Sequence, residues 1–481
     1  MTAAAPVAIV ADPPERWIQL VVLTAGILLA EAPWFASGAV APLLRVEWTT
    51  TGLDLPLLTV AVQLGFAVGA LGLAVAGAAD VIPGIRLFVV GCVAAAAANL
   101  GFAFLATNAA SALPFRFLTG VAIAAVYPIG IRLLAGWFRR DRGLAVGVLV
   151  GGLTVGSALP YLFRAIGAYA ALEWRPIVAM TSVAALIGAV VVGAFGRTGP
   201  FDVAAPRFSA AGAIAAVRDP AVRLANIGYL GHMWELFAMW TWIPLFLLAA
   251  FAAAGVTDVA LASLAAFVVV GAGGIGCIVA GVFADRIGRT TVTIAAMALS
   301  GTCAIACGLL FGQPAPVVFA VAVVWGITVI ADSAQFSSAI SELAPPGTAG
   351  SALSLQVAAG FLLTSVTIIV LGLTDTMDAT AWRIGFGILA LGPLVGIVAM
   401  WRLRQRPEAT LMASGHRGAR RPPARAPADE PLPPRPDRLL DLPRRAHGTR
   451  RRTARDPVDP PRARAHPAGP LAMRLRAART R

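Results

Sequence analysis

The stretch ILLAEAPWFASGAVAP, residues 27 to 42, places Glu31 in the middle of an apolar run. A second acid, Glu235, occurs 204 residues later in an equally apolar setting, GYLGHMWELFAMWTWIP, residues 228 to 244. Moving a lone carboxylate into hydrocarbon is costly. We therefore expect both acids to face a solvent-reachable cavity inside a membrane protein and not the lipid.

The composition supports a membrane protein. Of the 481 residues, 58% are hydrophobic and 13% are charged, whereas soluble proteins contain about 25% charged residues. Apolar segments of membrane-spanning length recur, and in lipid each must be helical because its backbone groups have no other partners. The sequence predicts an all-α polytopic protein with twelve spans near 18–41, 56–79, 87–107, 113–136, 143–163, 175–195, 225–251, 260–283, 291–311, 316–340, 350–373 and 383–402.

Arginine placement predicts the orientation of these spans. One alternate set of loops holds thirteen arginines, and the opposite set holds only Arg45, Arg164, Arg175 and Arg383. Since positive residues favour the cytoplasmic side, we expect both termini in the cytoplasm. The N-terminus lacks the basic and apolar regions of a removable signal peptide. We therefore expect a protein of the cytoplasmic (inner) membrane whose first span acts as its targeting signal.

The chain divides into five expected parts. These are a cytoplasmic N-terminal tail (1–16), a first six-helix bundle (17–196), a cytoplasmic loop rich in Pro, Gly and charge (197–222), a second six-helix bundle (223–404) and an Arg/Pro-rich tail (405–481). The last part holds 19 arginines and no aromatic residue, so it cannot bury a core and is predicted to be disordered. It either adheres to anionic lipid or results from a mispredicted end of the gene.

Landmarks of the two halves repeat in the same order. Four pairs occur at offsets of 204, 205, 206 and 208 residues: Glu31 with Glu235, Asp80 with Asp285, Gly120 with Gly326, and Trp174–Arg175 with Trp382–Arg383. Repeated halves in a membrane are typical of alternating-access carriers, which bind substrate between the repeats. The sequence thus predicts two pseudo-symmetric bundles.

The segment GVFADRIGRTT, residues 281 to 291, contains Gly281, Asp285, Arg286, Gly288 and Arg289. This G-x-x-x-D-R-x-G-R pattern resembles the cytoplasmic loop motif of the major facilitator superfamily, and the resemblance covers about residues 15–405. It implies that fold, and a cytoplasmic gate in which an acid at a helix end faces the partner half. Asp80 keeps the acid in the first half, although the spacing around it departs from the pattern. The alternative is a plain solvated loop.

Two further motifs support this resemblance. Arg116 and Gly120 resemble the fourth-helix motif of the family, whose intramembrane arginine is implicated in proton transfer. Gly147 and Gly156 have the spacing of its antiporter motif, but Pro160 and Tyr161 replace the Gly-Pro ending, which favours uptake over export. As an alternative, the glycines only allow close helix packing.

Ionisable side chains inside the spans predict the proton-coupling residues, Glu31, Arg116, Glu235 and Asp332. In the family, the first, fourth, seventh and tenth helices line the cavity, and these residues fall on them. Desolvation favours the neutral form of a buried carboxylic acid, and a nearby arginine favours the charged form. One of these acids can therefore exchange a proton with water. The alternative is a static Glu–Arg pair that joins helices.

A second group of side chains is expected to line the substrate cavity: Trp34, Gln63, Arg132, His232, Trp240, Gln335 and Gln356. The arginines suit a small organic anion, while the acids and tryptophans suit a cationic or aromatic compound. Tryptophan is also a common anchor at the membrane surface, and Arg132 is close enough to the cytoplasmic end of its span to extend out of the membrane.

The sequence lacks a nucleophile–base pair, a lysine for a phosphate-binding loop and a zinc-binding motif. We therefore expect no enzymatic activity, no cofactor, no metal and no nucleic-acid partner. The expected function is secondary active transport of a small molecule by a monomer, through alternating access, with proton-coupled uptake of a small organic compound. A proton-antiport exporter and a non-transporting membrane sensor on a carrier scaffold are the alternatives.

Overall fold

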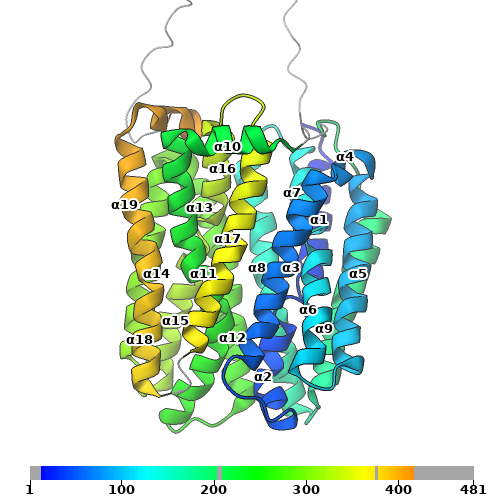
Figure 1. The fold of residues 1–481 in the computed structure, drawn as a ribbon, viewed down its shortest axis with the longest axis vertical. Coiled ribbons are helices and arrows are strands. Elements are labelled where there is room, and N and C mark those ends of the chain that lie inside the picture. The colour runs from blue at the N-terminus through cyan, green and yellow to red at the C-terminus, as the bar shows by residue number, and fades with distance from the viewer. Residues whose placement is uncertain (1–11, 203–207, 374–377, 416–481) are drawn as a thin grey trace, which may run out of the picture. The chain divides into compact units, whose positions relative to one another are not determined.

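The computed structural model describes residues 12–202, 208–373 and 378–415, and within these ranges the chain is helical apart from its turns. Figure 1 shows the helices running side by side. They are α1 (Arg16–Ala30), α2 (Ala36–Glu47), α3 (Asp54–Val75), α4 (Ala78–Val81), α5 (Gly84–Leu105), α6 (Ala109–Ile123), α7 (Tyr127–Ala135), α8 (Arg142–Tyr169), α9 (Trp174–Phe195), α10 (Ala210–Arg218), α11 (Pro220–Ala253), α12 (Val259–Gly271), α13 (Gly273–Ile287), α14 (Arg289–Leu309), α15 (Ala315–Val329), α16 (Ser333–Leu343), α17 (Ala349–Gly372), α18 (Ala379–Leu389), α19 (Leu391–Gln405) and the 3-10 helix η1 (Pro407–Gly415).

The predicted twelve-span fold is confirmed. Eleven helical segments in the described part of the chain are long and apolar enough to cross a membrane. The first predicted span, expected as one helix over 18–41, is instead two helices, since α1 ends at Ala30 and α2 begins at Ala36. Pro33 lies between them, and proline lacks a backbone N–H and disfavours helical geometry in the residue before it. The first span is therefore broken directly after Glu31.

Several other spans are also built from two helices. The fourth span breaks between α6 and α7 at residues 124–126, and the tenth breaks between α15 and α16 at residues 330–332. The eighth and twelfth spans break at Ala272 and Ala390. A break leaves backbone groups without their intrahelical partners, so polar side chains can bind there in the middle of the membrane.

The helices of the two halves pack in the same pattern. In the first half, α3 packs against α6, α5 against α9, and α1 against α8 and α9. The corresponding contacts in the second half are α12 with α15, α14 with α19, and α11 with α17 and α19. The halves then meet where α8 packs against α12 and α13, and where α3 packs against α17. The packing therefore agrees with the predicted duplication.

Two glycines of the predicted repeat occupy equivalent contacts. A Cβ atom at Gly120 of α6 would lie 2.1 Å from the carbonyl oxygen of Val62 in α3, and one at Gly326 of α15 would lie 1.8 Å from that of Val269 in α12. Neither distance leaves room for a side chain against rigid backbone. In lipid, where helices associate by close packing and not by hydrophobic burial, such contacts hold helix pairs together.

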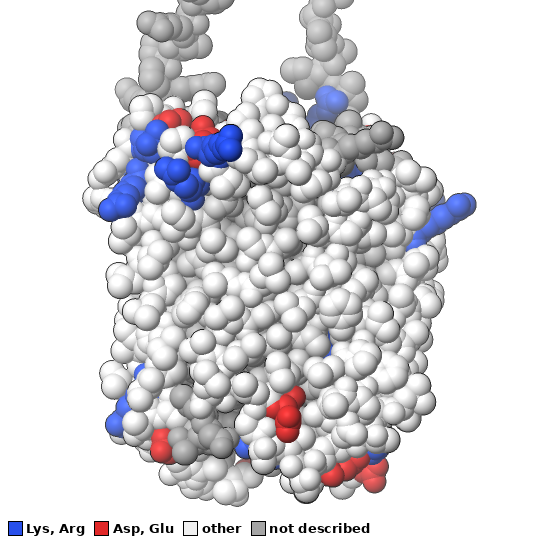
Figure 2. Space-filling model, in the orientation of Figure 1, with Lys and Arg blue, Asp and Glu red and all other residues white. Residues whose placement is uncertain are grey.

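The surface of the described helices matches a membrane environment. Figure 2 shows charged side chains gathered toward the two ends of the helices, with an uncharged band between them on this face. Large apolar side chains such as Val90, Phe104 and Val190 are exposed, with exposed fractions of 62%, 61% and 67%. The chain is therefore an integral, multi-pass membrane protein.

The regions outside the spans contain more helix than expected. The predicted loop 197–222 includes α10 and the start of α11, and α10 lies across the helix ends in Figure 1. The predicted tail begins with η1, which contacts α13, α16 and α19 and buries Ala409 and Met412. The expectation of disorder is thus wrong for residues 407–415, because these apolar side chains find a surface to pack on. The rest of the tail lies outside the described residues.

We predict that Gly120→Ala and Gly326→Ala each destabilise the protein, because the added methyl group must displace the backbone of a neighbouring helix. Overpacking of this kind costs about 1–3 kcal/mol, which exceeds the gain of roughly 1 kcal/mol in helix propensity. Thermal unfolding in detergent should show a lower melting temperature for both variants.

The matched control is Gly72→Ala in α3, where an added Cβ meets nothing within 4 Å. This variant should melt at or slightly above the wild-type temperature. If Gly120→Ala and Gly326→Ala melt like the control, the close helix contacts do not contribute to stability.

Candidate functional site

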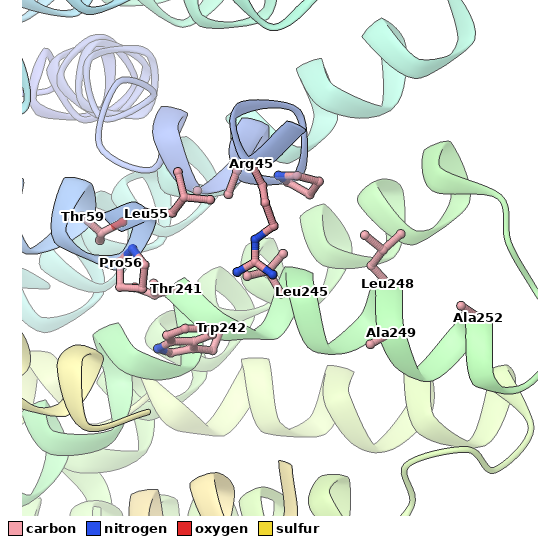
Figure 3. A pocket seen from close by; sticks show the side chains of 13 residues that line it. Arg45, Leu55, Pro56, Thr59, Thr241, Trp242, Leu245, Leu248, Ala249 and Ala252 are labelled. Carbon is pink, nitrogen blue, oxygen red and sulfur yellow. The ribbon is translucent and has the colours of Figure 1, made fainter. Parts of the chain in front are cut away.

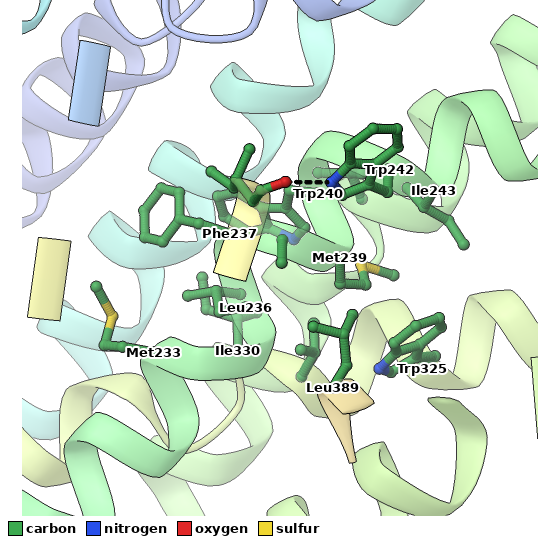
Figure 4. Packing of buried hydrophobic residues seen from close by; sticks show 14 of the residues in the cluster. Met233, Leu236, Phe237, Met239, Trp240, Trp242, Ile243, Trp325, Ile330 and Leu389 are labelled. Atoms are coloured by element: carbon green, nitrogen blue, oxygen red, sulfur yellow. Dashed lines mark hydrogen bonds between the residues drawn. The ribbon is translucent and has the colours of Figure 1, made fainter. Parts of the chain in front are cut away.

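Aromatic side chains from both halves meet in the middle of the protein. We call the following six residues the aromatic cluster: Trp34, Phe35, Phe66, Phe237, Trp240 and Phe361. The Trp34 ring centroid lies 5.6 Å from that of Phe237 and 5.6 Å from that of Phe361, and Phe66 lies 4.3 Å from Phe361. Figure 4 shows Phe237 and Trp240 packed among the apolar residues of α11. The cluster thus joins the break of the first span to α3, α11 and α17 across the interface between the halves.

Polar groups within and beside this cluster lack hydrogen-bond partners. The indole N–H groups of Trp34 and Trp240 and the side-chain amides of Gln63 and Gln356 are buried without a partner among the described residues. A buried polar group without a partner costs about 1–3 kcal/mol, so most proteins avoid it. Four of the predicted cavity residues therefore present free hydrogen-bonding capacity, as a site for a polar solute requires.

Glu31 lies at the end of α1, where the first span breaks. Its side chain has an exposed fraction of 0%, and neither carboxyl oxygen has a hydrogen-bond partner in the part of the chain that the structure describes. No ion pair links it to Arg116. The static Glu–Arg pair is therefore not formed in this conformation. An isolated carboxylate is costly at such a position, so the group needs a partner that the described residues do not supply in this conformation.

Arg116 instead holds the break itself. Its guanidinium donates hydrogen bonds to the carbonyl oxygens of Pro33 and Trp34 and to Oδ1 of Asn99, the first and last of these at 3.0 and 2.9 Å. The side chain is fully buried. Asn99 was not predicted from the sequence, because an isolated amide in an apolar span gives no sign of its partner. Arg116 thus satisfies backbone carbonyls that the helix break leaves free.

His232 and Asp332 form a second buried polar pair. His232 of α11 and Asp332, at the break between α15 and α16, each have a side-chain exposed fraction of 1%, and His Nδ1 lies 2.9 Å from Asp Oδ1. The distance allows an ion pair, but the alignment does not form a regular hydrogen bond, and His Nε2 is also unpartnered. The pair therefore keeps hydrogen-bonding atoms that have no partner among the described residues. Sequence spacing could not reveal it, since the two residues are 100 positions apart.

Glu235 has a different environment from Glu31, although the two match in the repeat. Its carboxylate accepts hydrogen bonds from Ser300 Oγ at 2.8 Å and from Trp325 Nε1 at 2.7 Å. Ser300 belongs to α14 and Trp325 to α15, so these contacts lie within the second half. The structure thus gives Glu235 two partners and does not bring it into contact with Glu31.

The residues of the loop motif lie where α8 approaches α13. A Cβ atom at Gly143 would lie 2.8 Å from Oδ2 of Asp285, and one at Gly281 would lie 3.1 Å from the Gly143 carbonyl oxygen. Gly288 joins α13 to α14 with a φ of +91°, a conformation that favours glycine. The acid of the motif therefore lies against the first turn of α8 in the partner half. Arg286 is exposed, and the side chain of Asp80 lies outside the described residues.

Arg289 connects the motif to the end of the tenth span. It donates to both carboxylate oxygens of Glu342, at 2.8 and 2.7 Å, and to Oε1 of Gln335 at 2.7 Å. Glu342 also accepts from the backbone N–H of Ala413 in η1. Gln335, predicted in the cavity, is thus placed beside the loop motif.

Two other arginines differ from their predicted settings. Arg132 lies 3.2 Å from the Asp202 carboxylate, near the inter-bundle loop. Arg164, counted as a loop residue, lies inside α8 with an exposed fraction of 9%, and no described residue forms an ion pair with it. Counting charges near span ends could not place these side chains, because the span boundaries were uncertain by several residues.

Comparison with known proteins identifies the fold. Residues 23–368 match the sequence model of the Major Facilitator Superfamily. No curated protein sequence matches the chain. The solved structures that resemble it include a bacterial homologue of the human lysosomal transporter Spinster (TM-score 0.61, 14% identity, covering 86% of this chain and 100% of that chain). They also include a mutant of the nucleoside transporter NupG (TM-score 0.61, 14% identity, covering 80% and 99%) and the xylose transporter XylE from E. coli (TM-score 0.63, 13% identity, covering 81% and 98%). At these identities the likeness shows the fold alone.

We predict that Arg116→Ala destabilises the protein strongly, because it leaves two buried carbonyl oxygens and the Asn99 side chain without their donor. Each lost partner costs about 1–3 kcal/mol. Arg116→Lys should show an intermediate loss, since an ammonium group cannot reproduce the forked geometry of guanidinium. Thermal unfolding in detergent measures both effects.

The control is Arg86→Ala, which removes an exposed arginine that forms no ion pair with any described residue. It should leave the melting temperature unchanged. An Arg116→Ala protein that melts with the wild type would show that this arginine does not hold the helix break.

Proposed function

The chain belongs to the Major Facilitator Superfamily and is a secondary transporter, and we propose that it drives the uptake of a small organic compound with a proton gradient. The observation that carries the proposal is a set of buried ionisable side chains at helix breaks, each with hydrogen-bonding atoms that lack a partner among the described residues. Glu31 lies at the break of the first span, and the His232–Asp332 pair lies at the break of the tenth.

Alternating access would act at the interface between the halves. The aromatic cluster closes this interface in the middle, and the contact of Asp285 with the first turn of α8 closes it at the end where the loop motif lies. A switch of this kind requires the two conformations to differ by only a few kcal/mol. Rings packed across an interface can separate without breaking covalent or ionic bonds, so the aromatic cluster is suited to reversible opening.

The proton would move with this opening. While the interface is closed, Glu31 and Asp332 are buried, where a charged carboxylate is costly to keep without a partner. When one side opens, water solvates the carboxylate and the proton can leave. Proton release on one side and binding on the other then couple the gradient to the conformational change. Glu235 differs from these acids because two side-chain donors already hydrogen-bond its carboxyl group.

The orientation of the protein follows from its arginines. The loops at the end where α1 begins hold most of them, and positive residues favour the cytoplasmic side. We infer that this end faces the cytoplasm and that the protein lies in the inner membrane. The loop motif is then a cytoplasmic gate, and the opposite end of α2, α3 and α11 faces outward. A proton-antiport exporter is the alternative direction of the same machinery.

We predict that Asp332→Asn and Glu31→Gln each abolish net transport driven by a pH gradient while leaving substrate exchange at equal pH. The substituted amides cannot ionise, so the step that releases a proton is blocked, whereas exchange requires no proton release. The measurement uses purified protein in liposomes with an imposed pH gradient and a panel of small acids, sugars and cationic dyes. A pH-sensitive dye inside the liposomes records the accompanying protons.

Glu173→Gln serves as the control, because Glu173 is an exposed acid outside the spans. It should transport like the wild type. Retention of pH-driven net flux by both Asp332→Asn and Glu31→Gln would refute the proton assignment. Substrate that moves in the direction opposite to the protons would replace proton-coupled uptake with proton-antiport export.

A further inference from the structure

A separate pocket lies between the halves, at the end of the helices opposite the loop motif. It is lined by α2, α3 and α11 and holds about 280 Å³ of open space, near the lower end of the roughly 300–1,000 Å³ typical of small-molecule sites. Figure 3 shows the Arg45 side chain extending from α2 toward Leu245 of α11. Since both halves contribute its walls, its shape must change when the halves move.

This pocket lies directly beyond the aromatic cluster. On α11, one turn separates the two, because Thr241 in the pocket donates a hydrogen bond to the carbonyl oxygen of Phe237 in the cluster. Thr59 in the pocket is four residues before Gln63, and Gly38 is three residues after Phe35. A solute in this pocket would therefore lie near the aromatic cluster and the unpartnered amide of Gln63.

The chemistry of the pocket combines apolar walls with a single cation. Leu55, Pro56, Leu245 and Leu248 belong to its apolar wall, and Arg45 is the only charged side chain among the described residues that line it. Arg45 is exposed and forms no ion pair with any residue that the structure describes.

The nearest acids along the chain have other partners. Glu47 pairs with Arg175 and accepts from the Trp174 indole. The Asp54 carboxylate accepts from the backbone N–H of Thr51. Arg45 is therefore free to bind a negative group that enters from the water.

We propose that this pocket is an entry site for a small organic anion with an apolar body, bound through its carboxylate by Arg45. The inference rests on the proposed function and specifies the class of its substrate. A monocarboxylate that crosses together with one proton adds no net charge to the interface. This suits a first-span break whose buried arginine, Arg116, already donates to backbone carbonyls. The limited volume favours a free acid over the acyl chain of a lipid.

The test measures occupancy of the pocket directly. Ala252 lines it and is exposed, whereas the four natural cysteines are buried. Full-length protein carrying Ala252→Cys is placed in nanodiscs of zwitterionic phosphatidylcholine, and its alkylation by a water-soluble maleimide is timed. 4-Phenylbutyrate should slow alkylation at a concentration about fivefold lower than the concentration of its neutral isostere 4-phenylbutyramide that has the same effect. A difference of this size is expected for one partly exposed ion pair.

Second-site variants identify the residue responsible. Arg45→Gln should abolish the difference between carboxylate and amide, and Arg45→Lys should keep it. If the two compounds protect the cysteine equally in the Ala252→Cys protein that keeps Arg45, the proposal is overturned. It would also be overturned if nanodiscs containing anionic phosphatidylglycerol protected the cysteine unaided, because a lipid would then be the occupant. Labelling needs no proton gradient, so a failure of the proposed coupling leaves this test valid.

Discussion

A polar group buried in a membrane needs a partner, and this constraint organises the interface between the two halves. Where the chain can supply a partner it does so, as with the Arg116 guanidinium on the Pro33 and Trp34 carbonyl oxygens and with Trp325 and Ser300 on Glu235. Where no described residue supplies a partner, at Glu31, Gln63 and Gln356, the groups lie near the interface between the halves. The helices of the two glutamines, α3 and α17, pack against each other across it, and Glu31 lies at the break that carries Trp34 and Phe35 of the aromatic cluster. Burial there is compatible with function because water, a proton or a solute can serve as the partner when the interface opens.

The helix breaks explain how such groups are held so far from water. A continuous helix satisfies its own backbone, and its side chains must then pack against lipid or other helices. A break in the first and tenth spans instead turns Glu31 and Asp332 into end-of-helix residues beside freed backbone groups. Arg116 stabilises one break, and His232 approaches the acid at the other. The same feature that costs backbone hydrogen bonds therefore positions the ionisable groups.

Much of this arrangement could be predicted from sequence, and the limits have physical causes. Span length and the repeat of Gly120 and Gly326 indicate the fold, because membrane thickness and close backbone contact constrain residue type strongly. The choice of Glu31 and Asp332 as buried acids follows from the same cost of desolvation. The partners of the buried polar groups could not be predicted from the sequence, because the His232–Asp332 pair and the hydrogen bonds to Glu235 join residues far apart in the chain. The break after Glu31 was visible as Pro33, but hydropathy alone made the span appear continuous.

The central claim is that the two halves close at one end while they open at the other. Distances between spin labels, measured by pulsed electron–electron double resonance, test it most directly. One pair of labels replaces exposed Arg142 and Arg286 beside the loop motif, and another replaces exposed Val46 and Ala253 near the pocket that Arg45 lines. A change between acidic and alkaline pH in a transport-competent protein should lengthen one distance and shorten the other. If both distances stay fixed, or both lengthen together, while the protein still transports, alternating access at this interface is contradicted.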